Sequence, residues 1–362
     1  MRGHGLRQGS KAHTTQGRER QMATNTITKI DIFNHIFPKT FFDKMLETVT
    51  DKGKVKRWLN IPFLVDLDVR FRKMDEFGDY RQILSLSAPP IEAMAGPEQS
   101  PDLARLGNDG MAEYCRLYKD RFPGFIASLP LNNPEASLIE LHRCMKDLKA
   151  VGVQLFSNVN GTPIDGPEYY PLFEAMAAYD KPIFLHPIRP PTVSDYASEK
   201  KSLYEIWWTF GWPYETSAAM ARLVFTKLFE KLPNIKIIAH HMGGMIPFFE
   251  GRVGPGWDQL GSRTADEDYV SLLKSLKKRP IDYFRMFYAD TALFGSASGT
   301  RCGMDFFGVD KVVFASDAPF DPEGGPMYIR DTIKVIDELD ISDSDRRKIY
   351  NGNASKLLQL TL

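Results

Sequence analysis

Eight short apolar segments, each about as long as a buried strand, recur along the chain and constrain its fold more than any other feature. They are Ile27–Phe33, Tyr80–Ser87, Phe125–Leu129, Val151–Phe156, Pro182–His186, Ile235–His240, Phe287–Asp290 and Val312–Ser316. Continuous apolar runs of this length are typical of strands that are covered on both faces, as in parallel sheets. Between several of them, apolar residues at three- and four-residue spacing predict helices at Gly107–Phe122, Ser137–Ala150, Tyr170–Tyr179, Ser217–Leu232 and Pro326–Leu339.

Strands that alternate with helices predict an α/β fold with a parallel sheet. In one chain of 362 residues, eight such strands are most economically a closed (β/α)8 TIM barrel in a single domain. A doubly wound open sheet is the alternative, but no G-x-G-x-x-G follows any predicted strand. We place the barrel domain at residues 26–362 and interpret residues 1–25, which are polar and basic, as a disordered N-terminal extension.

The composition excludes several classes of partner. Lys+Arg and Asp+Glu both number 46, so the formal net charge is zero, which argues against binding to nucleic acid or to an anionic membrane surface. No apolar run reaches the length of a membrane-spanning helix. The three cysteines are far apart and form no C-x-x-C motif, which is typical of reduced thiols in a cytoplasmic protein.

Polar side chains stand at, or just beyond, the ends of four predicted strands. These residues are His35, His186, His240, His241 and Asp317. In a (β/α)8 barrel the carboxyl ends of the strands form the active-site face, so we expect these side chains to meet there. Several imidazoles with one carboxylate suit a divalent metal, zinc above all, and a site with three protein ligands keeps a position open for water or substrate.

Six ordered motifs carry a family resemblance. They are KIDIFNHIFP, DVRFRKMDEFG, PIFLHP, GWPYETSAAMARLVF, IIAHHMGGMIPFFEGRV and VVFASDAPF. From about Thr28 to its C-terminus, the chain resembles the amidohydrolase superfamily, in the branch of aminocarboxymuconate-semialdehyde decarboxylase and the hydroxybenzoate decarboxylases. The resemblance implies a metal-dependent, non-oxidative decarboxylase that acts on a small carboxylated aromatic or dienoic acid.

The resemblance also implies roles for single residues. His35, His186 and Asp317 match metal ligands of the family, with Zn²⁺ as the expected ion and Mn²⁺ as the alternative. The family's first strand ends in His-x-His, and here Phe33 stands at the first of these positions, so we expect weakened metal binding. His241, and not the neighbouring histidine, matches the family's strand-six histidine, so His241 and Asp317 are expected to handle the proton.

Further matches concern the substrate and the assembly. Arg70 matches an arginine that contacts a substrate carboxylate, and Trp208 matches an aromatic residue of the substrate pocket. Arg252 matches an arginine that reaches the active site of a neighbouring subunit, so a homodimer is expected. A solvated ion pair for each arginine and plain packing for the tryptophan are the alternatives.

Two other functions fit the same residues. The first is hydrolysis or hydration of a small cyclic or unsaturated acid by the same metal centre, since hydrolases dominate the parent superfamily. The second is a metal-free binding protein, which the phenylalanine at the strand-one ligand position suggests. Release of CO₂ separates the decarboxylase from the first alternative, and stoichiometric metal excludes the second.

Overall fold

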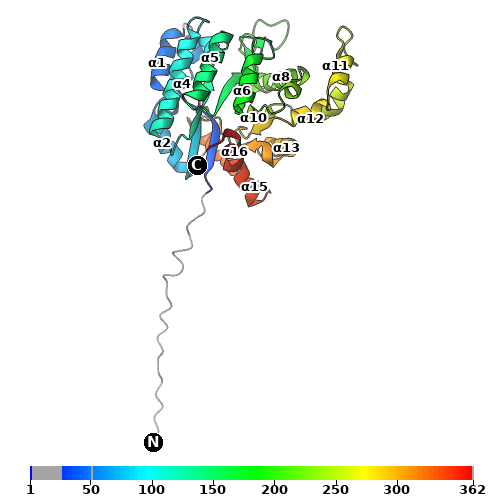
Figure 1. The fold of residues 1–362 in the computed structure, drawn as a ribbon. Helices are drawn as coiled ribbons and strands as arrows, with labels where there is room; N and C mark the ends of the chain where they lie inside the picture. Colours follow the sequence, from blue (N-terminus) through cyan, green and yellow to red (C-terminus); the bar gives the residue numbers. More distant parts are fainter. Residues whose placement is uncertain (2–26, 50–51, 361–362) are drawn as a thin grey trace.

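Eight parallel strands form the central sheet of the computed structural model, which describes Met1 and residues 27–49 and 52–360 (Figure 1). The strands are neighbours in the order β1-β2-β3-β4-β7-β8-β9-β10. Their bounds are β1 Lys29–His35, β2 Tyr80–Ser85, β3 Gly124–Ser128, β4 Gly152–Phe156, β7 Ile183–His186, β8 Ile237–Ala239, β9 Tyr288–Asp290 and β10 Val312–Val313. The segment that directly follows β10 bonds to β1 and closes the barrel, because Ile32 N donates to Phe314 O at 3.0 Å and His35 N donates to Ala318 O at 2.8 Å.

All eight predicted strands are present, and the prediction of a TIM barrel is confirmed. The sixth and the last of the predicted strands, β8 and β10, are each three residues shorter than predicted, and the shortening of the last has a clear cause. Strand β10 stops at Val313 because the next amide, Phe314 N, donates to Ile349 O instead of to a neighbouring strand. The predicted N-terminal extension, apart from Met1, lies outside the described residues.

Helices surround the barrel (Figure 1). Their bounds are α1 Lys39–Thr48, α2 Leu67–Met74, α3 Ile91–Met94, α4 Ser100–Leu117, α5 Pro134–Lys146, α6 Tyr170–Tyr179, α7 Ile206–Thr209, α8 Gly211–Phe225, α9 Leu228–Lys231, α10 His240–Gly243, α11 Tyr269–Ser275, α12 Pro280–Phe284, α13 Ala297–Phe307, α14 Pro326–Asp337, α15 Asp343–Arg347 and α16 Asn353–Leu358. A small hairpin, β5 Asn158–Val159 and β6 Thr162–Pro163, lies outside the central sheet. Short 3-10 helices are η2 Lys52–Val55, η3 Trp58–Asn60, η4 Pro62–Leu64, η5 Asp75–Phe77, η7 Trp257–Gln259 and η8 Val309–Lys311, and π-helical turns are η6 Arg252–Gly256 and η9 Lys348–Gly352.

Several helices differ from the predicted bounds; α4, for example, begins at Ser100 instead of Gly107 and ends at Leu117 instead of Phe122. Two other differences have local reasons. The predicted helix Ser217–Leu232 is in fact α8 followed by α9, because Lys227 adopts a left-handed conformation (φ 63°) that interrupts the helix. Helix α5 starts at Pro134, before the apolar periodicity begins, because the Asn133 side chain caps it by accepting from Ala136 N at 3.1 Å.

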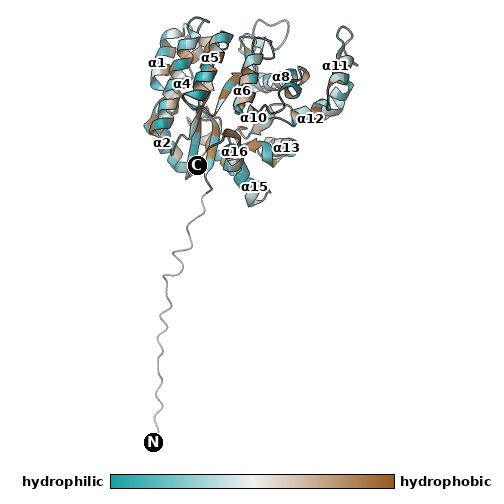
Figure 2. Ribbon diagram, in the orientation of Figure 1, coloured by the Kyte–Doolittle hydropathy of each residue, from teal (hydrophilic) through white to brown (hydrophobic). Residues whose placement is uncertain are grey.

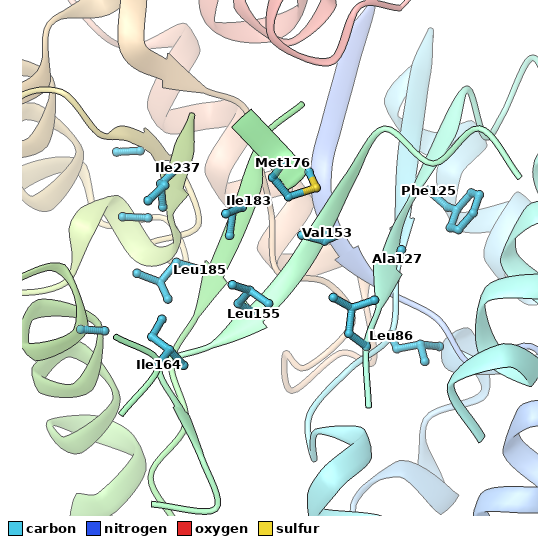
Figure 3. Packing of buried hydrophobic residues seen from close by; sticks show 14 of the residues in the cluster. Leu86, Phe125, Ala127, Val153, Leu155, Ile164, Met176, Ile183, Leu185 and Ile237 are labelled. Atoms are coloured by element: carbon cyan, nitrogen blue, oxygen red, sulfur yellow. The ribbon is translucent and has the colours of Figure 1, made fainter. Parts of the chain in front are cut away.

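Alternate strand residues face two different layers. One layer packs against the helices and includes Leu86, Val153, Leu155, Ile183, Leu185 and Ile237, several of which are labelled in Figure 3 together with Met176 of α6. The other faces into the barrel and includes Ile83, Ile126, Phe184, Ile238 and Val313. Figure 2 shows the strands coloured hydrophobic inside a more hydrophilic ring of helices, as expected for strands that are buried on both faces.

This two-residue alternation positions the functional side chains. On β7, Phe184 faces into the barrel, so His186 two residues later does so at the strand end. On β8, Ile238 faces inward, so the next inward position is that of His240. Among the described residues, no helix is both long enough and apolar enough to cross a membrane.

Candidate metal centre

Four buried side chains meet at the carboxyl ends of the strands. They are His35, His186, His240 and Asp317, and each offers one ligand atom within 4.8 Å of the others. The predicted ligands His35, His186 and Asp317 are thus brought together, and His240 joins them. All four residues are at most 5% exposed.

Hydrogen bonds at Nδ1 fix the tautomer of the three imidazoles. His35 Nδ1 donates to Leu86 O at 3.2 Å, and His186 Nδ1 donates to Pro187 O at 2.6 Å. His240 Nδ1 lies 2.6 Å from Asp290 Oδ2 and donates to this carboxylate. Since backbone carbonyls and ionised carboxylates only accept, Nδ1 carries the proton in each ring and Nε2 presents its lone pair, as in metal-binding histidines.

The convergence of these lone pairs on a carboxylate requires a cation. Asp317 Oδ1 lies 2.9 Å from His35 Nε2 and 3.4 Å from His240 Nε2. These separations are close to the distance of roughly 3.4 Å between neighbouring ligand atoms in a tetrahedral zinc site. Burial raises the pKa of Asp317, but the imidazoles of His240 and His35 beside it outweigh burial and hold this pKa well below its usual range.

The charges of the cluster also favour a bound cation. The ion pairs that involve Asp290 and Asp317 in the described part of the chain are all formed with histidines. Burial lowers the pKa of His240, but Asp290 outweighs burial and raises it to about 9. The two carboxylates therefore attract positive charge, which is a proton on His240 or a divalent metal in its place. The donor set fits such a metal.

His241 lies beside the four-residue cluster, as predicted. Its Nδ1 donates to Ala292 O at 2.7 Å, and its Nε2 lies 4.0 Å from Asp317 Oδ2. Adjacent residues of a strand face opposite sides, but His241 has a left-handed backbone (φ 52°), as has Met242 (φ 54°), so the chain turns sharply at this point. Burial and the neighbouring His240 lower the pKa of His241 to about 4, which keeps its Nε2 unprotonated at neutral pH.

Phe33 occupies the place of the missing ligand and lies among the imidazoles. Its ring centroid lies 4.2 Å from that of His240, 5.3 Å from that of His35 and 5.7 Å from that of His186. The side chain is 1% exposed. Position 33 therefore faces the cluster, but it contributes a hydrocarbon surface instead of a ligand atom.

Aromatic rings form a wall next to the histidines. Trp212 lies 5.3 Å from His186, and Trp208 lies 6.5 Å from Trp212 between ring centroids. On the other side, Trp208 stacks against Phe294 at 6.4 Å, and Phe294 lies 5.3 Å from His241. Trp208 thus lies near the metal centre, but Trp212 stands between it and His186.

The two arginines lie elsewhere. Arg70 on α2 is fully buried, and its guanidinium donates to His35 O and, at 3.2 Å, to Gln82 Oε1. In the structure it supports the backbone of a predicted metal ligand, and its contact with a substrate carboxylate stays a prediction. Arg252 begins the turn η6 and is exposed, so the structure does not bring it into the site of its own chain.

Sequence reasoning misses the part that two residues play in this centre. It places His240 at the active-site face but does not name it as a metal ligand, because only His241 matches the family motif. The two-residue alternation from Ile238 is the signal that identifies His240. Asp290 ends the predicted seventh strand, and this position alone would have predicted that its side chain lies at the barrel mouth.

A barrel with a His/Asp cluster at this face defines a class of metal-dependent enzymes. The chain belongs to the amidohydrolase family, because the family model described as "Amidohydrolase" matches residues 34–360. It is 33% identical over 308 residues to gamma-resorcylate decarboxylase of Polaromonas sp. strain JS666, and the match covers 82% of this chain and 89% of the relative. It is 28% identical over 349 residues to 2-amino-3-carboxymuconate-6-semialdehyde decarboxylase of Dictyostelium discoideum, with 92% of each chain covered.

A solved structure gives the same result. The crystal structure of a dihydroxybenzoic acid decarboxylase from Polaromonas sp. JS666, with bound manganese and the inhibitor 2-nitroresorcinol, superimposes with a TM-score of 0.74. The two proteins are 30% identical, and the match covers 92% of this chain and 97% of the other. The predicted family and fold are therefore confirmed.

Proposed function

We propose that this protein is a metal-dependent, non-oxidative decarboxylase of a small carboxylated aromatic acid. One observation carries the proposal: His35, His186, His240 and Asp317 each offer a ligand atom within 4.8 Å of the others at the mouth of a barrel, with His241 beside them. The similarity to decarboxylases that act on carboxylated aromatics supports the reaction type.

The metal would be held by His35, His186 and Asp317, and we propose Zn²⁺ as the resident ion. Imidazole nitrogens suit zinc, while Mn²⁺, which the similar Polaromonas structure contains, is the alternative. When bound, the ion supplies Lewis acidity, which polarises an oxygen of the substrate.

The reaction also needs a group that moves one proton. As the bond between the ring carbon and the carboxylate breaks, its electron pair stays on the ring carbon, CO₂ leaves, and a proton completes a new C–H bond. His241 is placed for this transfer because Ala292 O holds its Nδ1–H and leaves the free Nε2 facing the site, where it would take a proton from a hydroxyl of the substrate and pass it to the ring carbon. Asp317, 4.0 Å from that nitrogen, is the second proton-handling group.

The surroundings favour a flat substrate with polar substituents. Trp208 and Trp212 would cover the ring of an aromatic acid. A small pocket next to the metal centre is lined in part by Ser128 and Gln154, and Ser128 Oγ and Gln154 Oε1 are buried without hydrogen-bond partners. A ring hydroxyl would satisfy such atoms. Arg70 remains our candidate for binding the substrate carboxylate. To do so, its guanidinium would give up one of its present hydrogen bonds, such as those to Gln82 Oε1 and His35 O.

We also propose a homodimer and a cytoplasmic location. Phe248 is 79% exposed and Phe249 is 37% exposed, and both precede Arg252 on the same surface segment. An exposed apolar pair beside an arginine is a composition typical of interfaces, and pairing would bring Arg252 toward a neighbouring subunit. The free cysteines Cys115, Cys144 and Cys302 are compatible with a reducing compartment.

The function is tested by following CO₂ release from carboxylated phenols, starting with dihydroxybenzoates. We expect turnover by protein reconstituted with Zn²⁺ or Mn²⁺ and loss of turnover after chelation, with recovery on re-addition of metal. If an unsaturated or cyclic acid takes up water and no CO₂ is released, the function is hydration or hydrolysis instead of decarboxylation. Protein that binds no metal at all would contradict the proposal.

A further inference from the structure

Phe33 and His240 contact each other at the metal centre, and this contact suggests an exchange of roles. At position 33 the chain has a phenylalanine, whose ring faces the cluster but has no atom that binds a metal. The imidazole that packs on this ring, with 4.2 Å between centroids, belongs to His240. Position 33 on β1, which lacks a ligand atom, is therefore adjacent to the additional imidazole at the end of β8.

His240 has the properties of a metal ligand. It is fully buried, and its Nε2 makes no hydrogen bond to any described residue although it lies 3.4 Å from Asp317 Oδ1. Leaving a buried polar atom without a partner is unfavourable, because the atom has lost its hydrogen bonds to water, so such an atom needs an explanation. A metal ion bound at Nε2 supplies the missing partner.

Asp290 completes the arrangement from the other side of the ring. Its Oδ2 lies 2.6 Å from His240 Nδ1, while its Oδ1 accepts from His241 N and from Ala292 N, each at 3.1 Å. The carboxylate is thus held in place by the backbone and fixes both the tautomer and the orientation of the imidazole. A carboxylate that accepts from the far nitrogen of a histidine is a recurrent partner of metal-binding histidines.

We propose that His240 is the fourth protein ligand of the metal and replaces the ligand that Phe33 cannot supply, with Asp290 as its positioning residue. The proposal rests on the metal-binding part of the proposed function. It assigns three imidazoles and one carboxylate to the ion, and it leaves His241 free for proton transfer.

The first test counts the imidazoles on Zn²⁺ by X-ray absorption spectroscopy of the full-length protein. We expect three in the wild type, three in His241→Gln and two in His240→Gln. Two in the wild type would overturn the proposal. A count that falls in His241→Gln and not in His240→Gln would assign the ligand role to His241 and would also overturn it.

The second test measures Zn²⁺ affinity by competition with a chromophoric chelator. His240→Gln should lose at least about 100-fold, beyond the 10–100-fold typical for loss of an outer partner, which is the range we expect for Asp290→Asn. The matched control is His142→Gln, since His142 lies on α5, bonded to Tyr179 OH at 2.8 Å, and should keep the wild-type affinity.

The decisive variant exchanges the two positions. Phe33→His combined with His240→Gln returns an imidazole to β1, and we expect affinity to recover by at least about tenfold over His240→Gln, together with a third imidazole in the absorption spectrum. Wild-type affinity in a folded His240→Gln protein would overturn the inference. Three imidazoles in a protein that releases no CO₂ from any carboxylated phenol would overturn the proposed function alone.

Discussion

At the scale of single residues, the hydrogen bond at one ring nitrogen decides what the other can do. The carbonyls of Leu86, Pro187 and Ala292 each accept from a histidine Nδ1, so the opposite nitrogens face the site without protons. Asp317 is the residue at which these nitrogens meet, and its backbone is left-handed (φ 61°), a conformation that aspartate tolerates better than most residues.

Asp317→Asn should eliminate turnover, because the amide replaces both a metal ligand and a proton carrier. We expect a fall in kcat of at least about 100-fold, the lower range for loss of acid–base catalysis, with reduced metal content. CO₂ release and metal per chain measure the two effects. Asp343→Asn, at a side chain that is 83% exposed on α15, is the control and should change neither. Near-normal turnover in a folded Asp317→Asn protein would contradict the barrel-mouth site.

Glu92 is expected to make the stability of the protein depend on pH. The side chain is 4% exposed with Oε1 unpartnered, and burial raises its pKa from the usual 4.5 to about 8. Between these values the folded protein keeps a proton that the unfolded chain has lost, so stability falls as the pH rises through this window.

This group should lower the free energy of unfolding by up to about 1.4 kcal/mol per pH unit between pH 5 and 8. Glu92→Gln cannot ionise, so its unfolding free energy should fall less steeply over the same range. Urea denaturation of both proteins at several pH values makes the comparison. Parallel pH profiles would show that Glu92 does not titrate in this way.

At the scale of elements, the end of β8 depends on close packing with α13. A Cβ atom on Gly303 of α13 would lie 1.9 Å from Met242 Cγ, a separation that no pair of nonbonded carbon atoms tolerates. Met242 is 2% exposed and directly follows the two histidines. The absence of a side chain at Gly303 thus lets the turn that carries these histidines lie against the helix.

Gly303→Ala should destabilise the protein and weaken metal binding. Alanine is better than glycine by about 1 kcal/mol inside a helix, but overpacking costs about 1–3 kcal/mol, and the clash also displaces the histidine turn. Chemical denaturation and Zn²⁺ titration measure the two effects. Gly96→Ala is the control, because a Cβ there meets nothing within 4 Å. A more stable Gly303→Ala protein with unchanged affinity would mean that α13 moves freely.

At the scale of the whole molecule, the metal would join strands that are far apart in sequence. His35 and Asp317 are separated by 282 positions, and the site also draws on β7 and β8. An ion bound there stabilises only the folded barrel, since the unfolded chain does not assemble these ligands.

Removal of the metal should therefore lower the melting temperature. At a free metal concentration of about 1,000 times Kd the stabilisation is about 4 kcal/mol, which corresponds to roughly 6 °C for a chain of this length. Differential scanning calorimetry of chelated and reconstituted protein tests this expectation. Identical transitions would indicate that the cluster binds no metal.

The proposed homodimer belongs to the same scale. Phe248→Glu should shift the protein toward the monomer, because it places a charge on an exposed ring that the interface would bury. Sedimentation velocity of wild type and variant over a range of concentrations measures the change. Wild-type protein that sediments as a monomer at all concentrations would contradict the dimer.

The pattern of residues along the chain is enough to predict the barrel, its eight strands and the position of the clustered residues at one face. Burial on both faces makes each strand a continuous apolar run, and the carboxyl ends of parallel strands meet at one face. His35, His186 and Asp317 are therefore expected to lie together from their positions after these runs alone. This prediction depends on local properties, namely an apolar run and the polar residue at its end, which are repeated along the chain.

Three-dimensional packing, in contrast, selects which of two adjacent histidines lies closer to Asp317. The selection depends on the left-handed turn at His241 and Met242, on the carboxylate of Asp290 and on the missing side chain of Gly303, which lie on three separate elements. The same holds for Arg70, whose guanidinium is bonded to the backbone of β1. The alternation along β8 points His240 inward, but the contacts that place His241 and Arg70 join residues far apart in the chain, and no local pattern of residues encodes those contacts.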